Sequence, residues 1–294
     1  MEDTGRRLLK FKGYYFKRVG LDVDFLENLD DFEIRDDDDV FIITYPKSGT
    51  IWSQQLLSLI YFEEHGKRTE NLETVDRVPF LEYNFQNIDF SARPSPHLFS
   101  THLPHYLVPR GLKNKKAKVI YIYRNPKDVM CLYFHFSHKW AENEATTTIE
   151  EFMELFLEGK VTGSLWFDHI KSWYEHRSHF HIHFMMDEDM KKDLRNSVLK
   201  VCKFLGKELN EEVLDAVVRQ ATFQNMKYDP LANYENILNS QPGQKKKKAL
   251  FLCKGTIGDW KNHMTVEQNE RFEKIFQIKT KDFPLEFIWD INEE

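Results

Sequence analysis

The stretch "FIITYPKSGTIW", residues 41–52, holds the first residues whose types and spacing indicate chemistry. An apolar run ends in Lys47, Ser48 and Gly49, and a helical spacing follows at once. A turn from a strand into a helix directs successive backbone N–H groups at one point, and Lys47 adds a full positive charge there. We therefore predict a cradle for a phosphate or a sulfate over Tyr45–Gly49. The alternative is a tight turn with a surface lysine.

The loop is not a Walker A loop, because Phe41 and Pro46 occupy the positions of the two glycines in G-x-x-x-x-G-K-[ST]. A nucleotide kinase would also need an aspartate for Mg²⁺ after the second strand, where this chain has Arg124 in "YRNPKD". A small nucleoside kinase is therefore disfavoured. Arginine at that place indicates a second anion without a metal.

A third positive group, Lys254 beside Gly255 in "CKGTIGDW", suits a close approach of the backbone to an anion. Together with Lys47 and Arg124, it predicts a ligand with two phosphates. Trp52, one turn into the first helix, has two interpretations. It is either a core aromatic residue or a flat surface for a base.

Strands and helices that alternate along the chain must position these residues. Apolar runs predict strands at Val40–Thr44, Val119–Tyr123 and Phe180–Met186. Helical patterns follow from Ile51, from Pro126, which a first helical turn tolerates, and from about Asp189 to Gly206, with others over residues 164–177 and 210–221. The fold class is therefore α/β, a single domain with a central, mainly parallel sheet flanked by helices and a P-loop-like loop for a phosphate or a sulfate. Ligands of such sheets lie at the carboxyl ends of the strands.

Composition narrows the class of protein. With 294 residues, 41% of them hydrophobic and 30% charged, we expect one globular domain over residues 1–294. A formal charge of −6 argues against binding to nucleic acid through bulk charge. Neither a secretory leader nor a run of about 20 apolar residues is evident, so we expect a cytoplasmic protein without a membrane partner. Three widely spaced cysteines give no zinc pattern, and the run Asp36–Asp39 is expected to be a solvated turn.

Several motifs resemble the cytosolic sulfotransferase family: "TYPKSGTIW", "STHLP", "YRNPKD" and "KGTIGDWKNHMTVEQNERF". The resemblance runs from about Leu26 to the C-terminus. Within that family, "VPFLEYN" and "FPLEFIWDINEE" are most similar to the amine sulfotransferases, which transfer a sulfuryl group to nitrogen. The resemblance implies the donor 3′-phosphoadenosine 5′-phosphosulfate (PAPS), no metal, and a small amine or alcohol as acceptor.

The resemblance also implies the site residues. His102 matches the general base of the family and Lys47 the group that stabilises the leaving oxygen, although local spacing alone does not separate His102 from His97 or His105. Phe80 and Phe136 match residues that line the acceptor pocket. The implied donor-binding residues are Lys47, Ser48, Gly49, Thr50, Ile51, Trp52, Arg124, Thr222, Phe223, Met226, Phe251, Lys254 and Gly255.

A homodimer is also implied. "KNHMTVEQNE" matches the dimer motif of the family through Lys261, Thr265, Val266 and Glu270. As a cytoplasmic sulfotransferase of small molecules, the chain would serve xenobiotic metabolism.

Four positions depart from the family pattern. Leu132 replaces a serine and Cys253 an arginine, both ligands of the 3′-phosphate in relatives, while Asp187 replaces a tyrosine near the adenine and Ser100 a lysine. Losing two hydrogen bonds to a charged group would weaken donor binding by roughly 100-fold. A second hypothesis is therefore a pseudoenzyme that keeps the fold and the nucleotide but turns over weakly or not at all.

Overall fold

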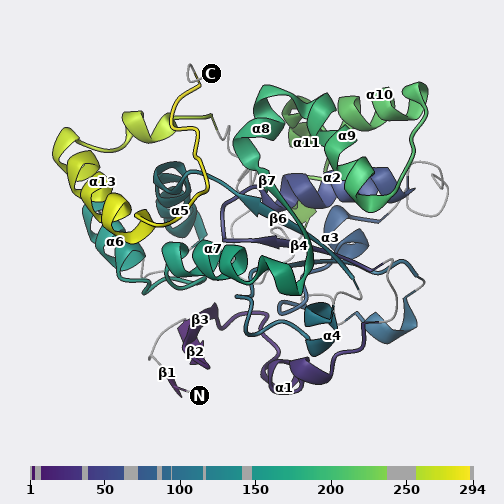
Figure 1. The fold of residues 1–294 in the computed structure, drawn as a ribbon, viewed down its shortest axis with the longest axis horizontal. Coiled ribbons are helices and arrows are strands. Elements are labelled where there is room, and N and C mark those ends of the chain that lie inside the picture. The colour runs from purple at the N-terminus through teal and green to yellow at the C-terminus, as the bar shows by residue number, and fades with distance from the viewer. Residues whose placement is uncertain are drawn as a thin grey trace.

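The computed structural model describes residues 2–3, 8–34, 39–62, 72–84, 88–93, 95–114, 117–140, 148–236 and 256–291 (Figure 1). Its centre is a four-stranded parallel sheet in the order β5 (Leu98–Thr101), β4 (Val40–Thr44), β6 (Lys118–Tyr123) and β7 (His181–Met186). In its register, Ile42 lies opposite both Ser100 and Ile120. The predicted α/β class and its parallel sheet are confirmed.

The two faces of the sheet belong to two apolar clusters, because successive side chains of a strand point to opposite sides. Ile42 and Ile120 face one cluster, with α2 (Thr50–Phe62), α9 (Leu194–Leu205) and α10 (Glu211–Gln220). Phe41, Ile43, Val119 and Tyr121 face the other, which contains residues of α5 (Pro126–Trp140), α6 (Ile149–Leu157) and α7 (Trp166–Glu175). Figure 1 shows the sheet between these two helical layers.

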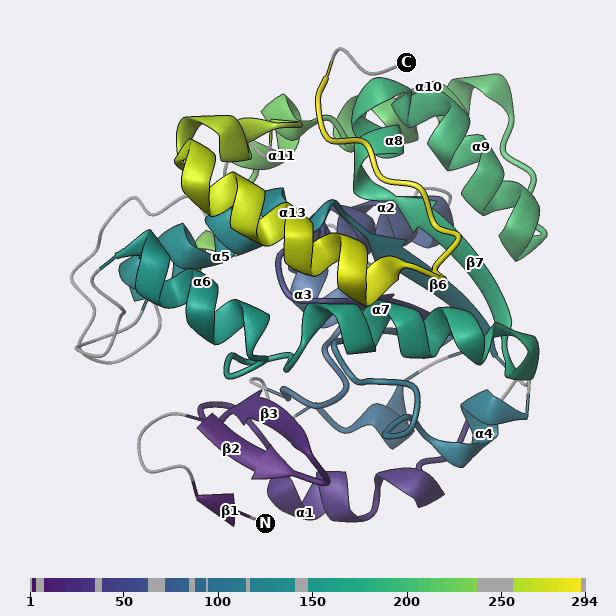
Figure 2. The same cartoon turned by 60° about the vertical axis from the view of Figure 1, so that its left-hand side comes forward.

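A long C-terminal helix, α13 (Val266–Thr280), lies across α5 and α6 (Figure 2). Arg271 pairs with Glu150 and Glu154 of α6 at 2.6 and 2.8 Å, and Lys127 of α5 pairs with Glu273 at 2.6 Å. The shorter helices are α1 (Val23–Glu27), α3 (Thr74–Arg77), α4 (Arg110–Lys113), α8 (Asp187–Lys192) and α11 (Phe223–Tyr228), with 3₁₀ turns at Leu29–Asp31, Phe90–Ala92, Arg177–His179 and Asp259–Asn262. Within the described part of the chain, none of the helices combines the length and the apolar character of a membrane span.

A second sheet at the N-terminus was not predicted. It is antiparallel and consists of β1 (Glu2–Asp3), β2 (Leu8–Phe11) and β3 (Tyr14–Lys17). Lys12 and Gly13 connect β2 to β3, both with positive φ (47° and 85°), which matches the twist of a two-residue hairpin turn. Tyr14 is buried and points from this hairpin toward the main sheet.

Two expectations about local structure need correction. The helix predicted from Asp189 to Gly206 is divided into α8 and α9, because Asp193 leaves helical geometry with φ −147° and accepts from the Asn196 N–H to cap α9. Gly206 does end α9, with φ 70°.

The acidic run is the second correction. Asp39 is fully buried and is no part of a solvated turn, since it pairs with Nδ1 of His97 at 3.1 Å. The rest of the run, Asp36–Asp38, lies outside the described residues.

Candidate active site

The carboxyl ends of the four parallel strands bring four polar side chains to one edge of the sheet. Lys47 follows β4, His102 follows β5, Arg124 follows β6 and Asp187 follows β7. The sequence predicted that the first three share a site, and parallel strands place them there. Asp187 was singled out only as a departure from a family pattern.

The loop after β4 has the geometry of an anion cradle. Lys47 and Gly49 both have positive φ, 71° and 94°, so the backbone turns sharply before α2 begins at Thr50. The Thr44 and Thr50 hydroxyls lie 2.7 Å apart and close the base of the turn. Among the described residues, the buried Oγ of Ser48 has no hydrogen-bond partner. A buried hydroxyl with free bonding capacity fits a loop that receives the oxygens of a ligand.

Two residues predicted to line the acceptor pocket lie beside the predicted catalytic residues. The Nζ of Lys47 lies over the ring of Phe136, a cation–π arrangement. The ring of Phe80 is 5.2 Å from the ring of His102. Phe136 therefore contacts Lys47, and Phe80 contacts His102.

The imidazole of His102 has a defined tautomer. Its Nδ1 lies 2.7 Å from the carbonyl oxygen of Thr44, and because a carbonyl only accepts, Nδ1 carries the hydrogen. In the neutral ring, Nε2 therefore keeps its lone pair. Burial lowers the pKa of His102 to about 4, the hydrogen bond to Thr44 opposes this shift, and the charge of Lys47 adds to it. At neutral pH the ring is uncharged and able to accept a proton at Nε2.

Three residues that sequence reasoning missed hold the backbone of His102. The Tyr14 hydroxyl donates to the carbonyl oxygen of His102, and Nε2 of His169 donates to the same oxygen at 3.0 Å. Glu82 accepts from the His102 N–H at 2.7 Å. Burial raises the pKa of the Glu82 carboxyl to about 7 and lowers that of His169 to about 3. No local pattern identifies these residues, which come from distant parts of the sequence.

Arg124 is surrounded by three buried carboxylates. Its side chain is 4% exposed, and Asp128, Asp187 and Glu188 lie 3.5, 3.5 and 3.9 Å from it. It donates to the carbonyl oxygen of Thr256 at 3.4 Å. Its buried Nε has no hydrogen-bond partner among the residues that the structure describes. A buried guanidinium with an unused donor at Nε fits the predicted second anion.

Comparison with known proteins relates the chain to one family. The sequence profile "Sulfotransferase domain" matches residues 37–284. The chain is 62% identical over its whole length to a rabbit (Oryctolagus cuniculus) protein named amine sulfotransferase, covering 97% of that protein. It is 38% identical over 96% of its length to human sulfotransferase 2A1, covering 98% of that protein. The crystal structure of mouse sulfotransferase SULT7A1 complexed with PAP superimposes with a TM-score of 0.74 at 30% identity, covering 94% of this chain and 96% of that one.

The chain belongs to the sulfotransferase family. This confirms the family that the motifs predicted. Over the described ranges, its His, Cys, Asp and Glu side chains form no group of three or more suited to a metal ion.

Several residues predicted to bind the donor lie together around the start of α11 in this sulfotransferase. Trp52 is half-buried, and its Nε1 donates to the carbonyl oxygen of Ala221 at 2.7 Å. Ala221 precedes Thr222, which caps α11, and this helix carries Phe223 and the buried Met226. Trp52 thus lies beside the start of α11. The predicted Phe251, Lys254 and Gly255, and the departure at Cys253, lie outside the described residues.

The other departures have different surroundings. Ser100 is fully buried on β5, where its Oγ accepts from the side-chain amide of Gln54 at 2.7 Å. A lysine at this position could not accept the hydrogen bond from Gln54. Leu132 is partly buried on α5, two turns after Arg124.

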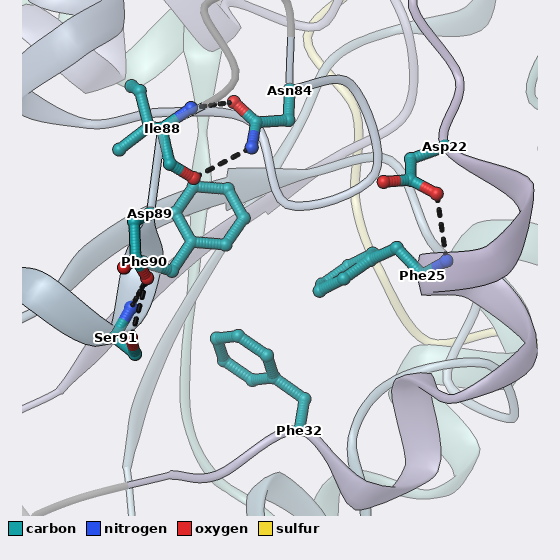
Figure 3. A pocket seen from close by; sticks show the side chains of 8 residues that line it. All are labelled: Asp22, Phe25, Phe32, Asn84, Ile88, Asp89, Phe90 and Ser91. Atoms are coloured by element: carbon teal, nitrogen blue, oxygen red, sulfur yellow. Dashed lines mark hydrogen bonds between the residues drawn. The ribbon is translucent and has the colours of Figure 1, made fainter.

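An open pocket of about 280 Å³ lies apart from these residues (Figure 3). The rings of Phe25, Phe32 and Phe90 line it and pack against one another with centroids 5.7–6.2 Å apart. The carboxylates at its rim serve as caps, since Asp22 accepts from the N–H of Phe25 and Asp89 from that of Ser91. We interpret it as a gap between packed elements, because none of the predicted site residues lines it.

Proposed function

We propose that this protein transfers the sulfuryl group of PAPS to the nitrogen of a small amine, or to a hydroxyl group, as one sulfotransferase domain over residues 1–294. The observation that carries the proposal is the placement of Lys47 and His102 at adjacent strand ends, joined through Thr44. The 62% identity to a protein named amine sulfotransferase supports nitrogen as the acceptor atom.

The donor supplies an activated sulfuryl group, and the residues of the chain fit it. The backbone N–H groups of Gly49 and Thr50 and the Ser48 hydroxyl are placed to hold its phosphosulfate, and Arg124 its 3′-phosphate, whereas the Ser48 N–H donates to the carbonyl oxygen of Tyr45 at 3.2 Å. Lys47 is placed to stabilise the negative charge that develops on the bridging oxygen. Positive and dipolar groups fixed before the reaction are effective because they need no reorganisation.

His102 is proposed to remove the proton that the acceptor loses as it attacks. Nδ1–H holds the ring on Thr44, so Nε2 is the atom that takes the proton. The pKa of about 4 applies to the donor-free protein, where the charge of Lys47 contributes to lowering it. An anion beside Lys47 would reduce that contribution and make His102 more basic.

The second hypothesis, a nucleotide-binding pseudoenzyme, is less well supported. Lys47 and His102 follow the adjacent strands β4 and β5, His102 is hydrogen-bonded to Thr44 at the end of β4, and Phe80 and Phe136 lie beside them. A protein that only bound the nucleotide would use Lys47 but would not need His102 with the ring of Phe80 beside it.

The first test uses acceptors of different basicity. With small aromatic and cyclic amines, the pH at which kcat/KM rises should follow the pKa of each amine, because only the neutral nitrogen has a lone pair. His102 should add no limb near neutral pH, since its pKa is lowered to about 4 and the ring is already neutral there. A labelled-donor assay across pH measures this.

A cyclohexanol-type alcohol is the matched control and should lack the acid limb of the amines. A pH profile that is the same for all amines would argue against direct attack by nitrogen. Absence of transfer to every acceptor, together with measurable binding of adenosine 3′,5′-bisphosphate, would establish the pseudoenzyme.

We also propose a cytoplasmic homodimer, formed through the motif that contains Lys261, Thr265, Val266 and Glu270. Val266 begins α13 and is 75% exposed, an unusual position for an apolar side chain. Thr265 caps the helix through Gln268, which fixes the orientation of the motif. A small self-complementary patch of this kind suits a twofold axis.

Replacing Val266 by glutamate should convert dimers to monomers in sedimentation velocity, because two like charges would meet at the axis. Ile278→Glu is the matched control, since Ile278 is 67% exposed on the same helix and lies outside the motif. That control should remain dimeric. Dimers that persist in Val266→Glu would place the interface elsewhere.

A further inference from the structure

Asp187 lies where the phosphosulfate-binding loop and Arg124 meet. It follows the last residue of β7, and its side chain is only 3% exposed. Its Oδ2 is 3.5 Å from Nε of Arg124. Its Oδ1 lies against Gly49, so closely that a Cβ at that position would collide with it. One buried carboxylate therefore contacts both proposed anion sites.

The other two carboxylates beside Arg124 have structural tasks. Asp128 accepts from the N–H groups of Gly258 and Trp260, both at 3.0 Å, and so fixes the 3₁₀ turn at Asp259–Asn262. Glu188 accepts from the backbone N–H of Asn125 at 3.0 Å. These contacts explain why both carboxylates are buried.

Asp187 differs from them in its contacts. Within the described part of the chain, the one hydrogen bond that its side chain accepts comes from Lys191, four residues later on α8. Among the residues that the structure describes, it caps no helix through its side chain and accepts from no backbone N–H group. Its negative charge is thus balanced by two cations, Lys191 and Arg124, and the second of these is the group that a phosphate would need.

We propose that Asp187 is a specificity-determining residue of the donor site, whose carboxylate competes with the phosphate groups of the nucleotide for Arg124. The inference rests on the proposed binding of a bisphosphate nucleotide by the loop and Arg124. Arg124 alternates between two anionic partners, one internal and one in the ligand. The chain therefore binds the donor and its bisphosphate product less tightly than the same site would with a neutral residue at this position.

The substitution Asp187→Asn tests this competition, because it keeps the shape of the side chain and removes its charge. Calorimetry at pH 8 is suitable, since burial raises the pKa of Glu188 to about 7 and its carboxyl is then ionised in both proteins. The Kd for adenosine 3′,5′-bisphosphate should fall by about tenfold or more. The Kd for adenosine 5′-phosphate should fall less, because that nucleotide lacks the second anion.

Asp189→Asn is the matched control. It removes the same charge from the same helix, but Asp189 does not pair with Arg124 among the described contacts. The Asp189→Asn variant should therefore bind both nucleotides with the Kd values of the unsubstituted protein. Lys191→Met is an independent variant that leaves Asp187 balanced by Arg124 alone. It should weaken bisphosphate binding several-fold.

The outcomes separate the two proposals. If Asp187→Asn leaves the affinity for the bisphosphate unchanged or weakens it, Asp187 positions Arg124 and does not compete with the ligand. If the unsubstituted protein and all three variants fail to bind the bisphosphate, the proposed donor site itself is wrong. A Lys191→Met variant that binds more tightly would also overturn the competition.

Discussion

Replacing His102 by alanine is expected to lower the rate of sulfuryl transfer by about 10²–10⁴-fold while the affinity for adenosine 3′,5′-bisphosphate stays nearly unchanged. The reason is geometric. The imidazole is held by the Thr44 carbonyl with Nε2 available for a proton, and none of its contacts among the described residues is with Arg124 or with the start of α11. Single-turnover rates at saturating donor, combined with calorimetry of the bisphosphate, measure the two quantities separately.

The matched control for this prediction is His138→Ala, because His138 is an exposed histidine of α5 whose loss should change neither quantity. An alcohol acceptor should show the larger loss, since an amine that binds in its neutral form depends less on a base. A His102→Ala variant that keeps most of its turnover with an alcohol would refute the assignment of the general base.

The second large effect is expected at Lys47. Lys47→Met keeps the hydrocarbon stem and the same strained backbone, with φ 71°, but removes the charge. Turnover should fall by about 10²–10³-fold, as for other groups that stabilise developing charge. Affinity for the bisphosphate should fall by about tenfold, because one charge-assisted hydrogen bond to the ligand is lost. Steady-state kinetics and calorimetry together check both effects.

Lys171→Met serves as the control, because Lys171 is a half-exposed lysine of α7 that pairs only with the neighbouring Glu175 in the described structure. It should behave like the unsubstituted protein. Lys47→Met with normal turnover and weakened nucleotide binding would mean that Lys47 binds the donor but does not act in the transfer step.

The parts of the fold that carry local signals were predictable. Val40–Thr44 is an uninterrupted apolar run before a loop, and it is β4 with the bounds predicted. Pro126 marked the first residue of α5, and Gly206 marked the end of α9. Because parallel strands end at one edge of a sheet, the order of the elements alone predicted that Lys47 and Arg124 lie at the same edge.

The parts that depend on distant contacts were not predictable from one sequence. β5 has four residues and no alternation that separates it from a loop, so the strand before His102 was missed. The burial of Asp39 depends on His97, 58 residues later, and a run of acidic residues gives no sign of such a partner. The position of Asp187 against Gly49 likewise requires β7 and the loop after β4 to be placed in space.

The hydrogen bond from Tyr14 to the carbonyl oxygen of His102 gives the N-terminal hairpin a direct part in the site. The same oxygen accepts from His169, which is itself held by the hydroxyl of Tyr121 at 2.8 Å. Removing or unfolding residues 8–17 is therefore expected to change the active site, although these residues are distant in sequence from every motif of the family. Truncated or N-terminally fused versions of the protein have to preserve this hairpin if their activity is to represent that of the whole chain.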